Sequence, residues 1–89
     1  MSDGGERRLS ELRVGERGRI VRHVGAPTIV QRAQEMGLLE GEALGAARGA
    51  PLGDPIAIVA AGLPLTLRRR EAEAIVVRTD GAGASERGR

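Results

Sequence analysis

Apolar residues recur three or four positions apart in one stretch of the chain and lie in short runs elsewhere. In that stretch the spacing lines one face of an α-helix; the residues are Ala26, Ile29, Val30, Ala33 and Met36. Pro27 suits the first helical position, where no N–H donor is needed, and Gly37 suits the left-handed cap after the last turn. The pattern therefore predicts an α-helix at about residues 27–36, with Leu38 folding back onto its last turn.

The other apolar runs are bounded by Gly, Pro or charged residues and predict strands. The run at residues 17–24 is rich in β-branched residues, and its imperfect alternation indicates a bulge between Ile20 and Val24. Gly62 separates two apolar runs, as in a β-hairpin. The predicted strands are residues 17–24, 42–48, 56–61, 63–69 and 75–78, with single helical turns at residues 9–12 and 71–74.

Five short strands, one helix and tight turns in 89 residues predict a mostly-β fold, a small barrel with one inserted α-helix and no exposed edge strand. Residues 1–8 and 79–89 are polar and rich in Gly, Ser and charge. Such segments bury too little apolar surface to offset chain entropy, so both are predicted to be disordered. Residues 9–78 then form one domain of about 70 residues, which leaves no room for a deep enzyme cleft.

The chain contains no Cys, Phe, Tyr or Trp. The absence of Cys excludes disulfides and thiolate chemistry, and the core must be built from Leu, Ile, Val, Ala and Met. His23 is the only imidazole, and no hydroxyl in the sequence is paired with it as a nucleophile would be. The composition therefore predicts a binding domain that is not an enzyme and has no catalytic residues.

All 14 basic residues are arginine, and they are interspersed with 12 acidic residues to give a net charge of +2. Nucleic acid is not expected as a partner, because the chain lacks both a clustered basic stripe and aromatic side chains on which bases stack. The longest apolar stretch is broken by Gly62 and Pro64 and is too short to span a bilayer. The first residues lack the basic start and apolar run of a signal peptide. A cytoplasmic protein is expected.

Four sequence elements, in register over about residues 9–78, resemble the FeoA family. They are residues 9–12 (LSEL) with 14–16 (VGE), residues 35–38 (EMGL) with 40–41 (EG), residues 50–56 (APLGDPI), and Gly62 with residues 65–68 (LTLR), 71–72 (EA) and 75–77 (IVV). The resemblance implies an SH3-like β-barrel with an inserted helix. It also implies a non-enzymatic accessory protein of bacterial ferrous iron uptake, which docks on the cytosolic GTPase portion of the FeoB transporter and modulates it. Contact with the inner face of the cytoplasmic membrane would then come only through the transporter.

The resemblance leaves one alternative function open. The same barrel is similar to the C-terminal domain of iron-dependent repressors, which implies a metal-responsive regulatory domain with transition metal ion binding. However, one His and no Cys cannot supply a closed soft-metal site within one chain. We therefore predict no metal ligands and no tightly bound cofactor, and at most a weak or oligomer-dependent association with Fe²⁺. A homo-oligomer is left open.

The candidate partner-binding residues are Met36, Gly37, Leu38, Leu39, Leu52 and Asp54. The first four form either a helix cap alone or a docking patch in which Leu38 and Leu39 stay partly exposed beside Met36. The last two lie in a loop rich in Pro and Gly, which is either a rigid turn or a grip on the partner through Leu52.

Two further motifs are open to a structural and a functional interpretation. The arginines at residues 68–70 are either a solvated strand end, supported by Glu71 and Glu73, or a small basic patch for an acidic partner surface or lipid headgroups. A lone histidine is more often a strand residue with its hydrogen bonds satisfied than a metal ligand, and this is expected of His23.

Overall fold

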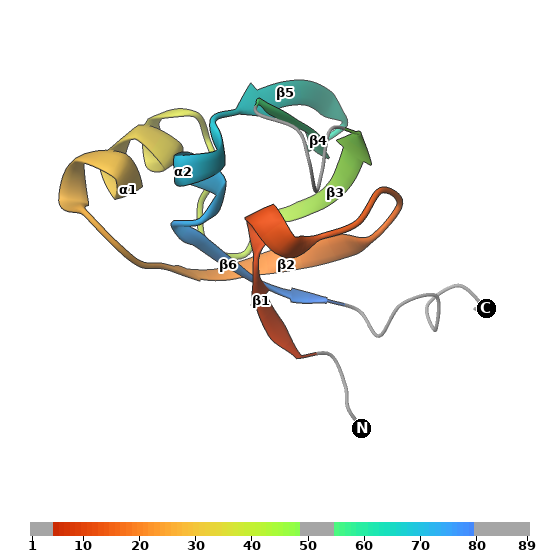
Figure 1. Ribbon diagram of the computed structural model, residues 1–89, viewed down its shortest axis with the longest axis horizontal. Coiled ribbons are helices and arrows are strands. Elements are labelled where there is room, and N and C mark those ends of the chain that lie inside the picture. Colours follow the sequence, from red (N-terminus) through yellow and green to blue (C-terminus); the bar gives the residue numbers. More distant parts are fainter. Residues whose placement is uncertain (1–4, 49–54, 80–89) are drawn as a thin grey trace.

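A six-stranded antiparallel sheet is the main structural element of the part of the chain that the computed structural model describes, residues 5–48 and 55–79 (Figure 1). The strands are β1 (Glu6–Arg8), β2 (Arg17–His23), β3 (Ala43–Arg48), β4 (Ile56–Ala60), β5 (Leu63–Leu67) and β6 (Ile75–Thr79). Their order across the sheet is β1-β6-β2-β3-β4-β5. The helices are the 3₁₀ turn η1 (Leu9–Glu11), α1 (Pro27–Glu35) and the single-turn α2 (Arg69–Ala72). The predicted mostly-β class with one substantial inserted helix is confirmed.

The sheet curls into a barrel-like shape without complete closure. Figure 1 shows β3, β4 and β5 folding over β2 and β6, with α1 and α2 side by side at one end. Within the described residues, β1 and β5 are the two edges and do not pair with each other, so the predicted full closure is wrong. Strand β1 has only three residues, and Pro64 in β5 has no N–H to donate, which limits the pairing that either edge can offer.

Aliphatic side chains alone fill the space that the sheet encloses, as the composition predicts. The buried cluster consists of Leu9, Leu12, Ile20, Ala33, Leu38, Leu44, Ala46, Ile56, Ile58, Leu67, Ala72, Ile75 and Val77. Burial of each Leu, Ile or Val stabilises the fold by about 1.5–3 kcal/mol. Helix α1 contributes only the small Ala33 to full burial, and it packs chiefly against α2.

The end of α1 is a Schellman cap, as its sequence predicts. Gly37 has a φ of +90°, the main-chain N–H of Leu38 donates to Ala33 O (3.1 Å), and that of Gly37 donates to Gln34 O (3.0 Å). The cap turns the chain back, and Leu38 thereby joins the core beside Ala33.

Two other local predictions are confirmed. Strand β2 shifts register against β6 between Ile20 and Arg22, which is the expected bulge. Strands β4 and β5 form the expected hairpin, with positive φ at both turn residues, Ala61 (54°) and Gly62 (80°). Two successive positive φ angles are typical of the hairpin turn whose twist matches the strands.

The prediction that residues 1–8 are disordered is wrong for Glu6–Arg8, which form β1 and pair with β6 in the register Arg7↔Val77. The segment carries no apolar residue, so its strand depends on main-chain pairing and on charge. Glu6 forms ion pairs with Arg78 on the adjacent strand β6 (3.1 Å) and with Arg22 on β2, the strand beyond it (2.6 Å). Thr79, the first residue of the predicted C-terminal tail, is likewise part of β6. Residues 1–4 and 80–89 lie outside the described residues. Among the described residues, no helix is long and apolar enough to cross a membrane.

Candidate partner-docking site

Residues 36–42, here called the cap segment, connect α1 to β3 and hold most of the candidate docking residues. Hydrogen bonds to β2 fix the end of this segment. The main-chain N–H of Gly41 donates to Ile20 O (2.8 Å), and that of Ile20 donates to Glu42 O (2.9 Å). The Arg19 guanidinium donates to Gly41 O (2.7 Å). The segment therefore has a defined conformation from the helix cap to the start of β3.

A side chain of β2 fixes the middle of the cap segment. The imidazole Nε2 of His23 lies 2.8 Å from the main-chain oxygen of Leu38, and the contact is partly buried. A carbonyl oxygen can only accept, so Nε2 is the donor. His23 is thus a strand residue with its hydrogen bond satisfied, as the sequence indicates.

The cap segment places its two leucines in opposite environments. Leu38 is only 1% exposed, because the Schellman cap folds it into the core. Of the two interpretations of this motif, the one that leaves Leu38 partly exposed is therefore wrong. Leu39 is 47% exposed, and Met36 is partly buried against the core. Within this segment Leu39 is therefore the large apolar side chain that is open to a partner. The predicted sites Leu52 and Asp54 lie outside the described residues.

An open groove of about 670 Å³ adjoins the cap segment and crosses β2, β3 and β4. Gly41 and Glu42 line its edge at the end of the cap segment. Near its middle, Gly45 lies opposite Val59 on β4 and opposite Arg17 on β2. Because Gly45 has no side chain, main-chain atoms form the floor of the groove between the side chains of Val59 and Arg17.

The groove and two exposed residues of the β4–β5 hairpin were not identified from the sequence. Val59 is 40% exposed and Leu63 is 65% exposed, although both lie in strongly apolar runs. A strict alternation of inward and outward positions along β4 would have indicated Val59, since Ile58 is its buried neighbour.

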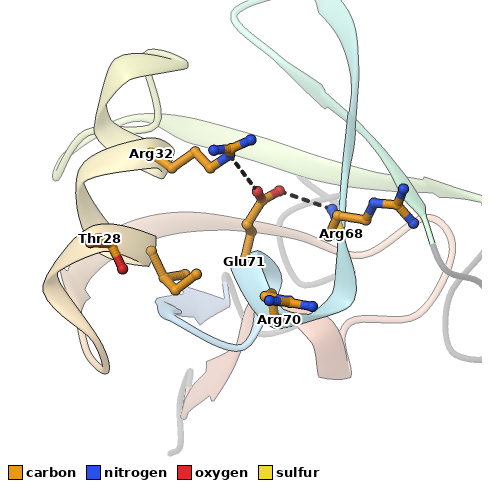
Figure 2. A pocket seen from close by; sticks show the side chains of 6 residues that line it. Thr28, Arg32, Arg68, Arg70 and Glu71 are labelled. Carbon is orange, nitrogen blue, oxygen red and sulfur yellow. Dashed lines mark hydrogen bonds and ion pairs between the residues drawn. The ribbon is translucent and has the colours of Figure 1, made fainter.

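The arginines at residues 68–70 do not form the expected strand end. Arg69 and Arg70 begin α2, and Glu71 is buried at 7% exposure. Figure 2 shows the Glu71 carboxylate between α1 and α2, with Arg32 on one side and Arg68 on the other. The spacing of Arg68 and Glu71, with a Glu three residues after the first cap position, is the sequence signal that could have indicated this helix start.

Two carboxylates near β1 have perturbed acidity. The hydrogen bond from Arg22 and the neighbouring Arg78 lower the pKa of Glu6 below its usual value. The pKa of Glu16 is lowered first by the hydrogen bond from the main-chain N–H of Arg13 (2.8 Å) and then by the Arg7 guanidinium (2.9 Å). Both carboxylates are held by arginines, so their role is to tie β1 and the following turn to the sheet.

The described residues do not fit a transition-metal site. In the ranges 5–48 and 55–79, no three His, Cys, Asp or Glu side chains come together as ligands would. The Nε2 atom of His23 already donates to Leu38 O.

Comparison with known proteins gives one family. A family model described as the FeoA domain matches residues 7–79. The solution structure of FeoA from Chlorobium tepidum is 40% identical, covers 83% of this chain and 70% of that chain, and has a TM-score of 0.72. FeoA of Stenotrophomonas maltophilia complexed with zinc, described as a procaryotic SH3 domain protein, is 29% identical. It covers 78% of this chain and 86% of that chain, with a TM-score of 0.66, and supports the SH3-like description of the barrel.

A second kind of protein shares the fold alone. A manganese-dependent transcriptional repressor superposes with a TM-score of 0.76 over 89% of this chain and 44% of that chain, at 19% identity. No curated protein sequence matches this chain significantly.

Proposed function

Because this chain belongs to the FeoA family, we propose that it is a non-enzymatic accessory protein of bacterial ferrous iron uptake that docks on the cytosolic GTPase portion of the FeoB transporter. The protein would act in the cytoplasm and reach the inner face of the membrane through this partner. The single observation that supports docking best is the exposed Leu39, held in a fixed segment at the edge of an open groove.

A rigid, exposed apolar side chain is a good anchor for binding. Little conformational entropy is lost when the partner covers Leu39, because the cap segment is already fixed by hydrogen bonds to β2. The groove that the end of the same segment lines offers Val59 for apolar contact and Arg17 for charge. These features suit a protein surface better than a small polar molecule.

Modulation of the transporter requires unequal binding to its states. A partner that binds two conformations equally shifts neither, so the proposed activity needs different affinities for the GDP-bound and GTP-bound forms of the GTPase portion. A tenfold difference corresponds to about 1.4 kcal/mol.

Binding of the purified chain to the isolated cytosolic portion of the cognate transporter, measured by biolayer interferometry in GDP and in a GTP analogue, tests the proposal. Leu39→Asp is expected to weaken binding at least tenfold, since a charge would be buried in the interface. Val14→Asp is the matched control, because Val14 is 58% exposed and lies in the turn before β2. Absence of binding by the unmodified chain, or equal loss in both variants, would contradict it.

The alternative of a metal-responsive regulatory domain is supported by the shared fold with the manganese-dependent repressor. It requires stoichiometric binding of Mn²⁺, Fe²⁺ or Zn²⁺ by this chain. Titration calorimetry with the three ions distinguishes the two functions. A regulatory domain should give the heat of stoichiometric metal binding, whereas docking on the transporter does not require this chain to bind a metal.

A further inference from the structure

A second recess lies between α1 and α2, near the opposite end of α1 from the cap segment. It has a volume of about 550 Å³ and is lined by Thr28, Ile29, Arg32, Arg68, Arg70 and Glu71 (Figure 2). Three of these six residues are arginines and one is a carboxylate. The wall of the recess therefore carries two positive charges in excess.

The carboxylate in the recess is fully engaged with the fold. Oε1 of Glu71 accepts the main-chain N–H of Arg68 (3.0 Å), and Oε2 pairs with Nε of Arg32 (3.0 Å). The Glu71 side chain is only 9% exposed, whereas that of Arg32 is 65% exposed. Glu71 thus orients the Arg32 guanidinium by its Nε and leaves the outer edge of that group toward solvent.

The other two arginines of the recess contribute little to holding the fold. Arg68 binds Glu71 through its main-chain N–H, so its guanidinium has no part in that contact. Within the described residues, neither Arg68 nor Arg70 forms a side-chain hydrogen bond or an ion pair. Exposed, unmatched guanidinium groups are suited to carboxylates, with which they form strong two-point hydrogen bonds.

The arrangement of the three arginines favours an extended ligand. In Figure 2 the guanidinium groups of Arg32, Arg68 and Arg70 lie on different sides of Glu71 and do not point to one place. A single small anion could therefore meet only one or two of them. Ile29 adds a half-buried apolar surface to the lining of the same recess. Several carboxylates along one chain, with an apolar side chain among them, match this pattern.

We propose that this recess is a docking site for an acidic peptide segment of a protein partner. The site is separate from Leu39, because Thr28, Ile29 and Arg32 lie in the first six residues of α1 and Leu39 follows the end of that helix. It goes beyond the proposed function and does not depend on it, since the recess is defined by charge and shape alone.

The experiment uses the full chain labelled with ¹⁵N and a capped hexapeptide with glutamate at four positions and isoleucine at one. The titration is done at about 0.15 M salt, where charges more than about 8 Å apart are largely screened. Saturable shifts confined to the amides of Thr28, Ile29, Arg32 and residues 68–71 are expected. The same peptide with glutamine in place of glutamate should give none. Shifts of equal size around every exposed arginine, or no saturable shift, would overturn the proposal.

A matched pair of double variants separates this site from general charge attraction. Arg68→Glu/Arg70→Glu is expected to weaken the peptide's affinity at least tenfold. Arg13→Glu/Arg17→Glu makes the same change in net charge at another exposed place. It should change the peptide's affinity less than about threefold. Equal weakening in both pairs would overturn the proposal. Inorganic phosphate is the last probe: saturation of the same amides as tightly as by the peptide would show a small-anion site instead.

Discussion

The side chain of His23 donates a hydrogen bond to the main-chain oxygen of Leu38 and so ties β2 to the segment that follows α1. The two atoms are 2.8 Å apart, and the residues are 15 positions apart in the chain. This contact fixes the buried Leu38 and, next to it, the exposed Leu39.

His23→Ala is expected to lower the free energy of unfolding by about 0.5–1.5 kcal/mol, the usual net contribution of one hydrogen bond. It should also speed hydrogen exchange at the Gly41 amide, which bonds to Ile20 O in the same region. Urea unfolding and exchange by NMR measure the two effects. His23→Gln, whose amide can donate to the same oxygen, is the control and should lose less. Unchanged exchange in the alanine variant would contradict this role.

Truncation of the two adjacent leucines of the cap segment should change the free energy of unfolding by very different amounts. Leu38→Ala removes a fully buried side chain and is expected to cost about 2–5 kcal/mol. Leu39→Ala, at an exposed position, should change the stability by no more than about 0.5 kcal/mol. The difference in urea midpoints checks this. Similar losses in the two variants would mean that the cap does not bury Leu38 as described.

Two glycines on neighbouring strands differ in the space beside them. A Cβ at Gly18 would lie 3.0 Å from Arg78 O and 3.3 Å from Val77 Cβ, whereas one at Gly45 would meet nothing closer than 3.5 Å. Gly18→Ala should therefore destabilise the protein by about 1–3 kcal/mol through a forced shift of β2 against β6. Gly45→Ala should be neutral or stabilising by up to about 1 kcal/mol. Thermal unfolding of the two variants gives the comparison, and the reverse order would refute it.

The free energy of unfolding should decrease at acid pH, in part because Glu16 becomes protonated. Folding lowers the pKa of this carboxyl through the main-chain N–H of Arg13 and the guanidinium of Arg7, so the folded protein binds the proton more weakly than the unfolded chain. The contribution is therefore complete above the ordinary pKa of about 4.5 and is lost as the pH falls through the lowered value. Urea midpoints from pH 6 to pH 3 should fall less steeply in Glu16→Gln than in the unmodified chain. Parallel curves would argue against this assignment.

Much of the fold could be predicted because local signals and burial agree. The apolar spacing before Gly37 gave a helix at about residues 27–36, and α1 is Pro27–Glu35. The hairpin around Gly62 and the bulge in β2 were likewise predicted from local residue types. The agreement is incomplete in the hairpin, because Val59 and Leu63 belong to its apolar runs and are nevertheless exposed.

What sequence reasoning missed depends on contacts between distant residues. Strand β1 carries only charged side chains and is held by pairing with β6, some seventy residues away, so no local pattern marks it. The sequence left open whether Leu38 is partly exposed or belongs to the helix cap alone, because its burial depends on how the glycine cap directs it. Burial of Glu71 likewise arises from Arg32 on another helix, which no spacing within residues 68–71 can show.

The pairing of β1 with β6 also has a practical consequence for handling the protein. The N–H of Thr79 donates to the oxygen of Gly5 (3.3 Å), so the chain enters and leaves the domain at one corner, which Figure 1 shows away from α1 and α2. A fluorophore, an affinity tag or a second domain attached next to Gly5 or Thr79 would lie at that corner. It would leave Leu39 and the arginine recess accessible. The same proximity makes a short splice between Gly5 and Thr79 feasible, with new termini opened in a surface turn.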